Sequence, residues 1–176
     1  MKARILGVAI VLLTGCGTAN KPLSARQWEA LERVVTGDLQ FKARWAEPLQ
    51  TNSMNQIANA GLIPPGSNVN RIDLTGTANY LKVKGDRVEM QLPYYGERQV
   101  NQTYGRASGM EFEGTATNIR TTKNESRNHY DLEFNLKDKT ELLQCNLRVF
   151  SNMRALLTIY SNQRQMIRYE GEVTPE

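Results

Sequence analysis

The sequence has very little cysteine or histidine: two cysteines, Cys16 and Cys145, and one histidine, His129, in 176 residues. Cys16 follows an N-terminal apolar stretch that we assign below to export and lipid attachment, so Cys145 has no partner for an intramolecular disulfide. Neither a Cys-x-x-Cys motif nor a histidine cluster is present, and both zinc and haem sites depend on such groups. We therefore expect no metal, no cofactor, and a fold that rests on burial and backbone hydrogen bonding.

The chain also lacks a strong excess of charge of either sign. Without Lys2 and Arg4, 20 basic residues remain against 18 acidic ones, a net charge of +2. The basic residues are scattered and interleaved with acids, whereas proteins that bind nucleic acid carry a concentrated basic surface. We therefore exclude nucleic acid as a partner.

Long apolar runs are absent apart from one at the N-terminus. Lys2 and Arg4 precede the apolar residues 5–13, and small residues follow, which is the pattern of a signal peptide. The run is too short for a membrane-spanning helix, which needs about 20 apolar residues. The segment 13–16, Leu-Thr-Gly-Cys, resembles the bacterial lipobox, in which the cysteine is diacylated. The alternative is an ordinary secretory signal with a chance cysteine.

This resemblance gives the expected domain organisation and location. We expect a signal peptide over residues 1–15, a tether lipidated on Cys16 over 16–23, and a single domain over 24–176. In lipobox proteins an aspartate after the cysteine favours the inner membrane, and here that residue is Gly17. The resemblance therefore implies the outer membrane, and the absence of acids in 17–21 favours its periplasmic face. The lipid would make the membrane a partner of the protein.

The first part of the domain has the period of an amphipathic helix. Ser24 with Gln27 forms a capping-box pattern, and Gly37 is a plausible C-terminal stop. The apolar residues between them share one face, which we interpret as a lid packed on a sheet rather than as a membrane-binding face: Trp28, Leu31, Val34 and Val35. A second, short helix is possible around 55–59.

After Gly37 the hydrophobic period changes to two, which is typical of half-buried strands. About nine strands follow, mostly joined by short turns, with a polar turn expected at 122–128. This pattern predicts a mainly β fold, an antiparallel meander closed as a barrel or a sandwich with the N-terminal helix packed on it. The expected strands are 39–45, 72–74, 81–83, 88–92, 110–116, 130–136, 143–149, 155–159 and 167–173.

Several motifs between 39 and 173 resemble one known family. They are Asn-Tyr-Leu at 79–81, Leu-Pro-Tyr-Tyr-Gly-Glu-Arg at 92–98, Gly-Met-Glu-Phe-Glu-Gly at 109–114 and Ile-Arg-Tyr-Glu-Gly at 167–171. The chain is similar to the family called domain of unknown function 4251. The resemblance implies a small secreted or lipid-anchored bacterial protein, in agreement with the signal sequence. It implies no reaction and no catalytic residues.

Few residues could support catalysis. A catalytic triad would have to use His129, which we interpret as a surface residue beside a turn. Cys145 shares an apolar strand face with Leu143 and Leu147, which favours a buried, inert thiol. Glu111 and Glu113 lie one strand repeat apart, about 6.6 Å, which falls within the spacing of an inverting glycosidase pair. Any Glu-x-Glu strand has this spacing, so we favour a solvated outer face and expect no catalytic residues.

The long connection 93–108 is the segment most typical of a binding surface. Tyrosine and arginine combine contact area with polar groups, and this connection holds five of them: Tyr94, Tyr95, Arg98, Tyr104 and Arg106. For Tyr94 and Tyr95 the alternative is that they cover the open end of the sheet.

These features favour a non-catalytic binding module of the cell envelope, whose partner could be an envelope protein. A carrier that holds a small apolar ligand in a barrel lumen is the second hypothesis. An envelope glycoside hydrolase using Glu111 and Glu113 is the third and weakest.

Overall fold

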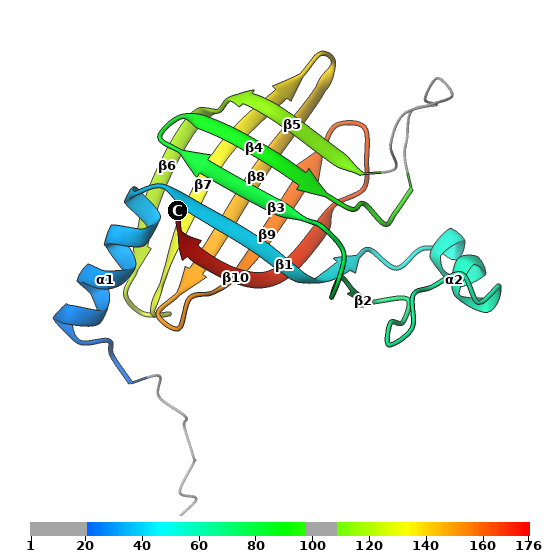
Figure 1. The fold of residues 1–176 in the computed structure, drawn as a ribbon, viewed down its shortest axis with the longest axis horizontal. Helices are drawn as coiled ribbons and strands as arrows, with labels where there is room; N and C mark the ends of the chain where they lie inside the picture. Colours follow the sequence, from blue (N-terminus) through cyan, green and yellow to red (C-terminus); the bar gives the residue numbers. More distant parts are fainter. Residues whose placement is uncertain (1–20, 98–108) are drawn as a thin grey trace, which may run out of the picture.

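The computed structural model describes residues 21–97 and 109–176, which form a mainly β domain with two helices. The antiparallel strands curve into a nearly closed barrel, and α1 packs beside it (Figure 1). The predicted fold class is thus confirmed, with the barrel as the form of closure. The elements are α1 (Ala25–Thr36), β1 (Leu39–Pro48), α2 (Asn52–Asn59), β2 (Ile72–Asp73), β3 (Tyr80–Lys84), β4 (Arg87–Leu92), β5 (Met110–Thr115), β6 (Thr117–Asn124), β7 (His129–Asp138), β8 (Glu141–Phe150), β9 (Arg154–Ser161) and β10 (Ile167–Pro175).

Helix α1 begins and ends where its sequence predicts. The Ser24 hydroxyl accepts from the Gln27 backbone N–H, the Gln27 side chain accepts from the Ser24 N–H, and Gly37 is the C-cap. The apolar face is buried against β7 and β8, with the Trp28 ring edge-on to Tyr130 at a centroid distance of 5.6 Å. The helix is therefore the expected lid on the sheet.

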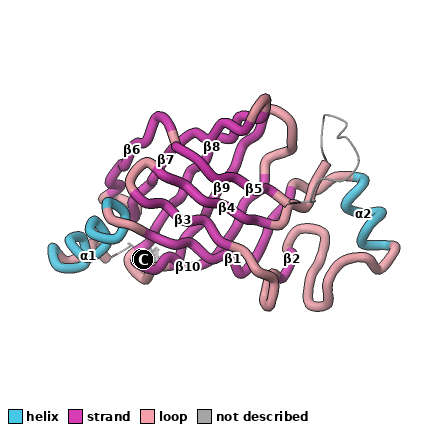
Figure 2. Tube along the Cα trace, turned by 45° about the horizontal axis from the view of Figure 1, so that its top comes forward, coloured by secondary structure: helices cyan, strands magenta, loops and turns pink. Residues whose placement is uncertain are grey.

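The order of the main sheet is β5-β4-β3-β1-β10-β9-β8-β7-β6, and β2 pairs with β1 beside this path. The two outermost strands, β5 and β6, are consecutive in the chain and are separated by Ala116 alone. The Ala116 N–H donates to the Asp86 carbonyl at 2.7 Å, and β5 also contacts β7. The chain therefore passes from one edge of the sheet to the other at Ala116, which brings the edges together and nearly closes the barrel (Figure 2).

The strand β6 is the main departure from the sequence prediction, which placed a polar turn at 122–128. The strand continues to Asn124 and pairs with β7, and the turn occupies only the residues after it. All but the last of its side chains are exposed. An edge strand with solvent on both faces has no hydrophobic alternation, so the period-two signal that reveals the other strands is missing here.

A bulge in β1 shapes the outer wall of the barrel. The register between β1 and β10 shifts between Ala43 and Trp45, so that Arg44 and Trp45 both lie outside the core. The buried side chain of Asn79 stabilises the bulge, since its Oδ1 accepts from the Ala43 N–H at 2.8 Å and its Nδ2 donates to the Ala43 carbonyl at 3.0 Å. Such bulges redirect side chains at an otherwise regular surface.

The Gly171→Ala substitution is expected to destabilise the barrel by about 2–3 kcal/mol, the cost typical of overpacking. Gly171 lies opposite Ala43, and an added Cβ would lie 2.0 Å from the Lys42 carbonyl oxygen and 2.8 Å from the Ala43 Cα. Both atoms belong to the backbone and cannot rotate away. Urea unfolding measures the loss, with Gly114→Ala as the control because the nearest atoms to its Cβ belong to the Phe112 side chain and not to the backbone. Equal losses in the two variants would contradict this reading of the bulge.

The turns of the meander define two ends of the barrel. The tether end carries α1, the β6–β7 turn and the β8–β9 turn, and the loop end carries the β4–β5 connection, the β7–β8 turn and the β9–β10 turn. The eight residues of β9 run from one end to the other, about 26 Å at 3.3 Å per residue.

Candidate functional site at the loop end

The loop end is built on a buried ion pair between Arg164 and Glu141. The guanidinium of Arg164 donates through Nε to Glu141 Oε1 at 2.7 Å and through Nη2 to Oε2 at 3.0 Å. Only 9% of the Arg164 side chain and 14% of the Glu141 side chain are exposed. The bidentate geometry is the strong form of such a pair. It ties the β9–β10 turn to the start of β8.

Arg164 also holds both stems of the β4–β5 connection. Its Nη1 donates to the Gly109 carbonyl at 3.0 Å, just before β5, and its guanidinium carbon lies 5.3 Å from the ring centroid of Tyr94, just after β4. One side chain therefore contacts the segments on either side of residues 98–108. Neither Arg164 nor Glu141 stands out in the sequence, because each looks like an ordinary polar residue near a turn.

Tyr94 and Tyr169 also hold the stem of the β4–β5 connection. Together with Arg164 and Glu141 they form what we call the frame. The Tyr94 hydroxyl lies 3.0 Å from the carbonyl oxygens of both Glu97 and Gln165, and it can donate to one of them at a time. The Tyr169 hydroxyl donates to the Pro93 carbonyl at 2.7 Å, and burial raises the pKa of Tyr169 well above its usual range. The phenol is therefore neutral and remains a donor at physiological pH. These bonds make the stem of the connection a rigid support.

The five predicted binding residues have different environments. Tyr94 is buried in the frame, which corresponds to the alternative that it covers the end of the sheet. Tyr95 is half-buried against the core, and burial raises its pKa. Arg98, Tyr104 and Arg106 lie outside the described residues. Tyr95 is thus the predicted residue that the structure places at the surface of the frame.

The expected surface position of His129 is wrong. Its ring lies on the outer side of β7 but is buried, because Phe150 of the neighbouring strand packs edge-on against it at a centroid distance of 5.7 Å. Its Nε2 lies 3.2 Å from Asp131 Oδ2, and its Nδ1 lies 3.3 Å from the Arg127 carbonyl. Asp131 in turn accepts from Arg148 Nε at 2.8 Å. Both partners of the ring nitrogens are acceptors, so the N–H of either tautomer has a partner, and the ring is held in a structural position.

Cys145 and the Glu111–Glu113 pair lie where the alternation predicts. Cys145 is buried in the core, and desolvation raises the pKa of its thiol to about 12, so the nucleophilic thiolate is scarce at physiological pH. Glu111 and Glu113 are exposed on the outer face of β5, and Glu113 pairs with Arg87 at 3.1 Å. A solvated carboxylate pair of this kind lacks the enclosed, apolar surroundings of a catalytic general acid.

No helix in the described part of the chain is long and apolar enough to cross a membrane. Within residues 21–97 and 109–176, no group of three or more His, Cys, Asp or Glu side chains is placed to hold a metal ion. No curated protein matches the sequence.

The family model described as domain of unknown function (DUF4251) matches residues 24–173. The chain belongs to the DUF4251 family. Its fold is similar to that of a DUF4251 family protein from Bacteroides eggerthii, known from a crystal structure, with a TM-score of 0.57 at 15% sequence identity. The match covers 86% of this chain and 89% of that one. The shared DUF4251 fold thus extends over nearly the whole described domain, and it assigns no activity.

Proposed function

We propose that this DUF4251 protein is a cell-envelope lipoprotein whose barrel is a non-catalytic binding module. The lipid on Cys16 holds it on the periplasmic face of the outer membrane, and the loop end binds an envelope partner. The observation that carries the proposal is that Lys21 of the tether and the stem of the β4–β5 connection lie at opposite ends of the barrel.

The tether enters at the end opposite the loop. The Lys21 carbonyl accepts a hydrogen bond from Asn128 Nδ2 in the β6–β7 turn at 2.9 Å. Lys21 follows Cys16 by five residue steps, and an extended chain spans at most about 3.6 Å per step, so this end of the barrel would lie within roughly 18 Å of the lipidated residue. The stem of the β4–β5 connection is bonded to the β9–β10 turn at the far end of β9. An anchored barrel would therefore present that connection away from the membrane.

A rigid frame that carries a connection rich in tyrosine and arginine is typical of a binding surface. Arg164, Tyr94 and Tyr169 hold the stem, so a partner would not have to order it, which lowers the entropic cost of binding. The interior of the barrel is occupied by large buried side chains, including Phe41, Phe134 and Tyr169. For this reason we place binding on the outside rather than in a lumen.

The Tyr95→Ala variant is expected to lose partner capture while the barrel stays folded. Truncating a hot-spot tyrosine costs about 2 kcal/mol in binding, roughly a thirty-fold loss of affinity. The measurement is native pull-down from the intact envelope, with quantitative mass spectrometry of the proteins recovered by the wild-type and variant chains, alongside their melting temperatures.

Tyr160→Ala is the matched control, because Tyr160 is an exposed tyrosine on β9 outside the frame. It should recover the same proteins as the wild type. If Tyr95→Ala instead lowered the melting temperature and recovered the wild-type set of partners, the role of Tyr95 would be structural and the loop end would not be the binding surface.

A further inference from the structure

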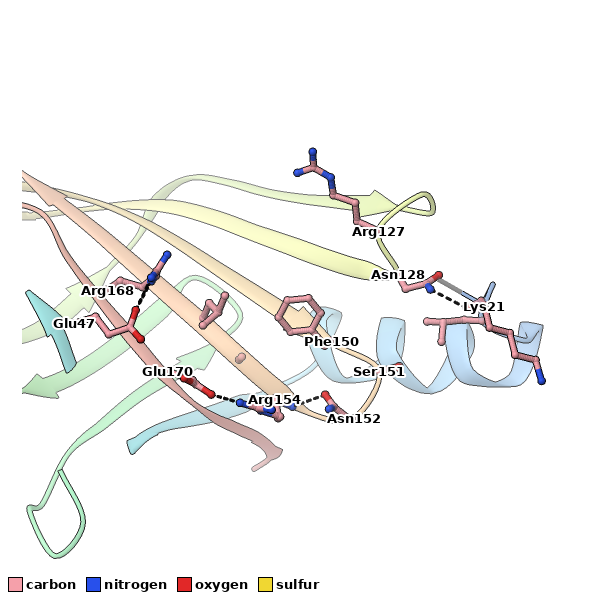
Figure 3. A pocket seen from close by; sticks show the side chains of 13 residues that line it. Lys21, Glu47, Arg127, Asn128, Phe150, Ser151, Asn152, Arg154, Arg168 and Glu170 are labelled. Carbon is pink, nitrogen blue, oxygen red and sulfur yellow. Dashed lines mark hydrogen bonds and ion pairs between the residues drawn. The ribbon is translucent and has the colours of Figure 1, made fainter. Parts of the chain in front are cut away.

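A second concave surface lies on the outer wall, away from the loop end. It is a pocket of about 720 Å³ that begins beside the tether and the β6–β7 and β8–β9 turns and continues along β9 and β10 to Glu47 of β1 (Figure 3). This volume is within the range of small-molecule sites in proteins. The family match assigns no ligand to it.

The pocket has an apolar floor. Leu23 of the tether, Phe150 at the end of β8 and Leu156 of β9 line it, and each is only half-buried. Leu156 and Phe150 point outward from the barrel, so the core does not cover them. Apolar area left accessible in a concavity is an available contact for an apolar group.

The rim of the pocket is cationic, because its arginines are more exposed than the two carboxylates with which they pair. Glu47 accepts from Arg168, Nε at 2.7 Å and Nη2 at 2.5 Å, and Glu170 pairs with Arg154. The exposed side-chain fractions are 21% and 16% for the two glutamates but 51% and 60% for Arg168 and Arg154. A ligand approaching this wall would therefore meet guanidinium groups first. Dashed lines in Figure 3 mark the Glu47–Arg168 and Glu170–Arg154 pairs.

The positive charge around the pocket exceeds the negative charge. Arg71 also donates to Glu170 at 2.6 Å, so three arginines share two carboxylates. Lys21 and Arg127 line the pocket too, and neither forms an ion pair with any residue in the described part of the chain. The carboxylates orient the arginines, and an uncompensated positive charge remains for an anion.

We propose that this pocket binds an amphipathic anion, a molecule with a phosphate or carboxylate head and an apolar body. The head lies against Arg154 and Arg168, which offer charge-assisted hydrogen bonds in planar, oriented geometry. The body lies on Leu156 and Phe150. This site is separate from the loop end, and the proposal does not depend on lipidation of Cys16.

Octyl phosphate is a suitable probe, with inorganic phosphate and 1-octanol as its two halves. Isothermal titration calorimetry is carried out below the micellar range on the full-length chain with Cys16→Ala, which removes the predicted acyl chains as competing ligands. We expect octyl phosphate to bind at least ten-fold more tightly than either half. Equal affinity for inorganic phosphate, or for 1-octanol, would overturn the amphipathic site.

Two substitutions on the same ion pair should act in opposite directions. Arg168→Gln removes a guanidinium and should weaken octyl phosphate at least ten-fold, whereas Glu47→Gln removes a competing carboxylate and should strengthen binding several-fold. If the pair were only structural, neither change would alter affinity. The double variant Arg168→Gln/Glu47→Gln leaves no unpaired carboxylate in this pair, and it should also bind weakly.

Leu156→Ser tests the floor and should weaken octyl phosphate but not inorganic phosphate. Lys137→Gln is the control, since Lys137 is a cation on β7 at the loop end of the barrel. Circular dichroism establishes that each variant is folded. An affinity reduced equally by Arg168→Gln and Lys137→Gln would show general charge attraction and would contradict the proposal.

Discussion

The Cys16→Ala variant is expected to carry no fatty acid and to leave the membrane fraction. The Leu-Thr-Gly-Cys segment at 13–16 makes Cys16 the predicted acylated residue. Each buried CH₂ contributes about 0.8 kcal/mol to membrane attachment, and two or more chains make it stable, so the loss should be complete. Metabolic labelling with an alkyne-bearing fatty acid, followed by fractionation, measures both effects.

The second cysteine provides the matched control. Cys145 is buried in the core, so Cys145→Ala should keep the label and the membrane attachment in full. Label that persists in Cys16→Ala would refute the lipobox assignment. That result would leave the barrel and the outer-wall pocket unaffected, because neither depends on the anchor.

The Glu141→Ala variant is expected to lose about 3 kcal/mol of stability. It leaves the guanidinium of Arg164, of which only 9% is exposed, without its bidentate carboxylate. Removing one partner of a buried ion pair destabilises a protein by more than the intact pair stabilises it, since the remaining charge stays desolvated. Urea unfolding measures the change. Because Arg164 bonds to the Gly109 carbonyl and makes a cation–π contact with Tyr94, the stem of the β4–β5 connection should also exchange its amide hydrogens faster.

Two further variants separate the buried charge from a general effect of losing an acid. Glu133→Ala, at an exposed position on β7, should change stability by less than about 0.5 kcal/mol. Glu141→Ala combined with Arg164→Leu should recover part of the loss, because the buried guanidinium is removed together with its carboxylate. A double variant as unstable as the sum of its single variants would contradict this explanation.

Much of the fold could be predicted because its signals are local. The capping box of Ser24 and Gln27 places the start of α1 within a few residues. The alternation through β7, β8, β9 and β10 reports the inner and outer faces of each strand, and it places Cys145 in the core before any contact is known. A sequence of many alternating strands also implies closure of the sheet, but it left barrel and sandwich equally open.

The candidate sites were harder to predict, because they combine residues that are distant in the chain. Arg164 and Glu141 meet only because β8 pairs with β9, which places Leu143 opposite Ser161. His129 is polar and follows a turn, and its burial involves the Phe150 ring of the adjacent strand. Glu47 and Arg168 lie 121 residues apart. Composition and periodicity carry no information about such pairs.

The sequence by itself therefore determined the mainly β class, the N-terminal helix, the family and the burial of Cys145, since each depends on residues near one another in the chain. Tertiary structure alone decided the closure at Ala116, the edge strand β6, the Arg164 frame and the cationic pocket. Each of these depends on strand order and register, which are set by the packing of the whole sheet. The outward position of Trp45, for example, follows from a bulge that only pairing with β10 reveals.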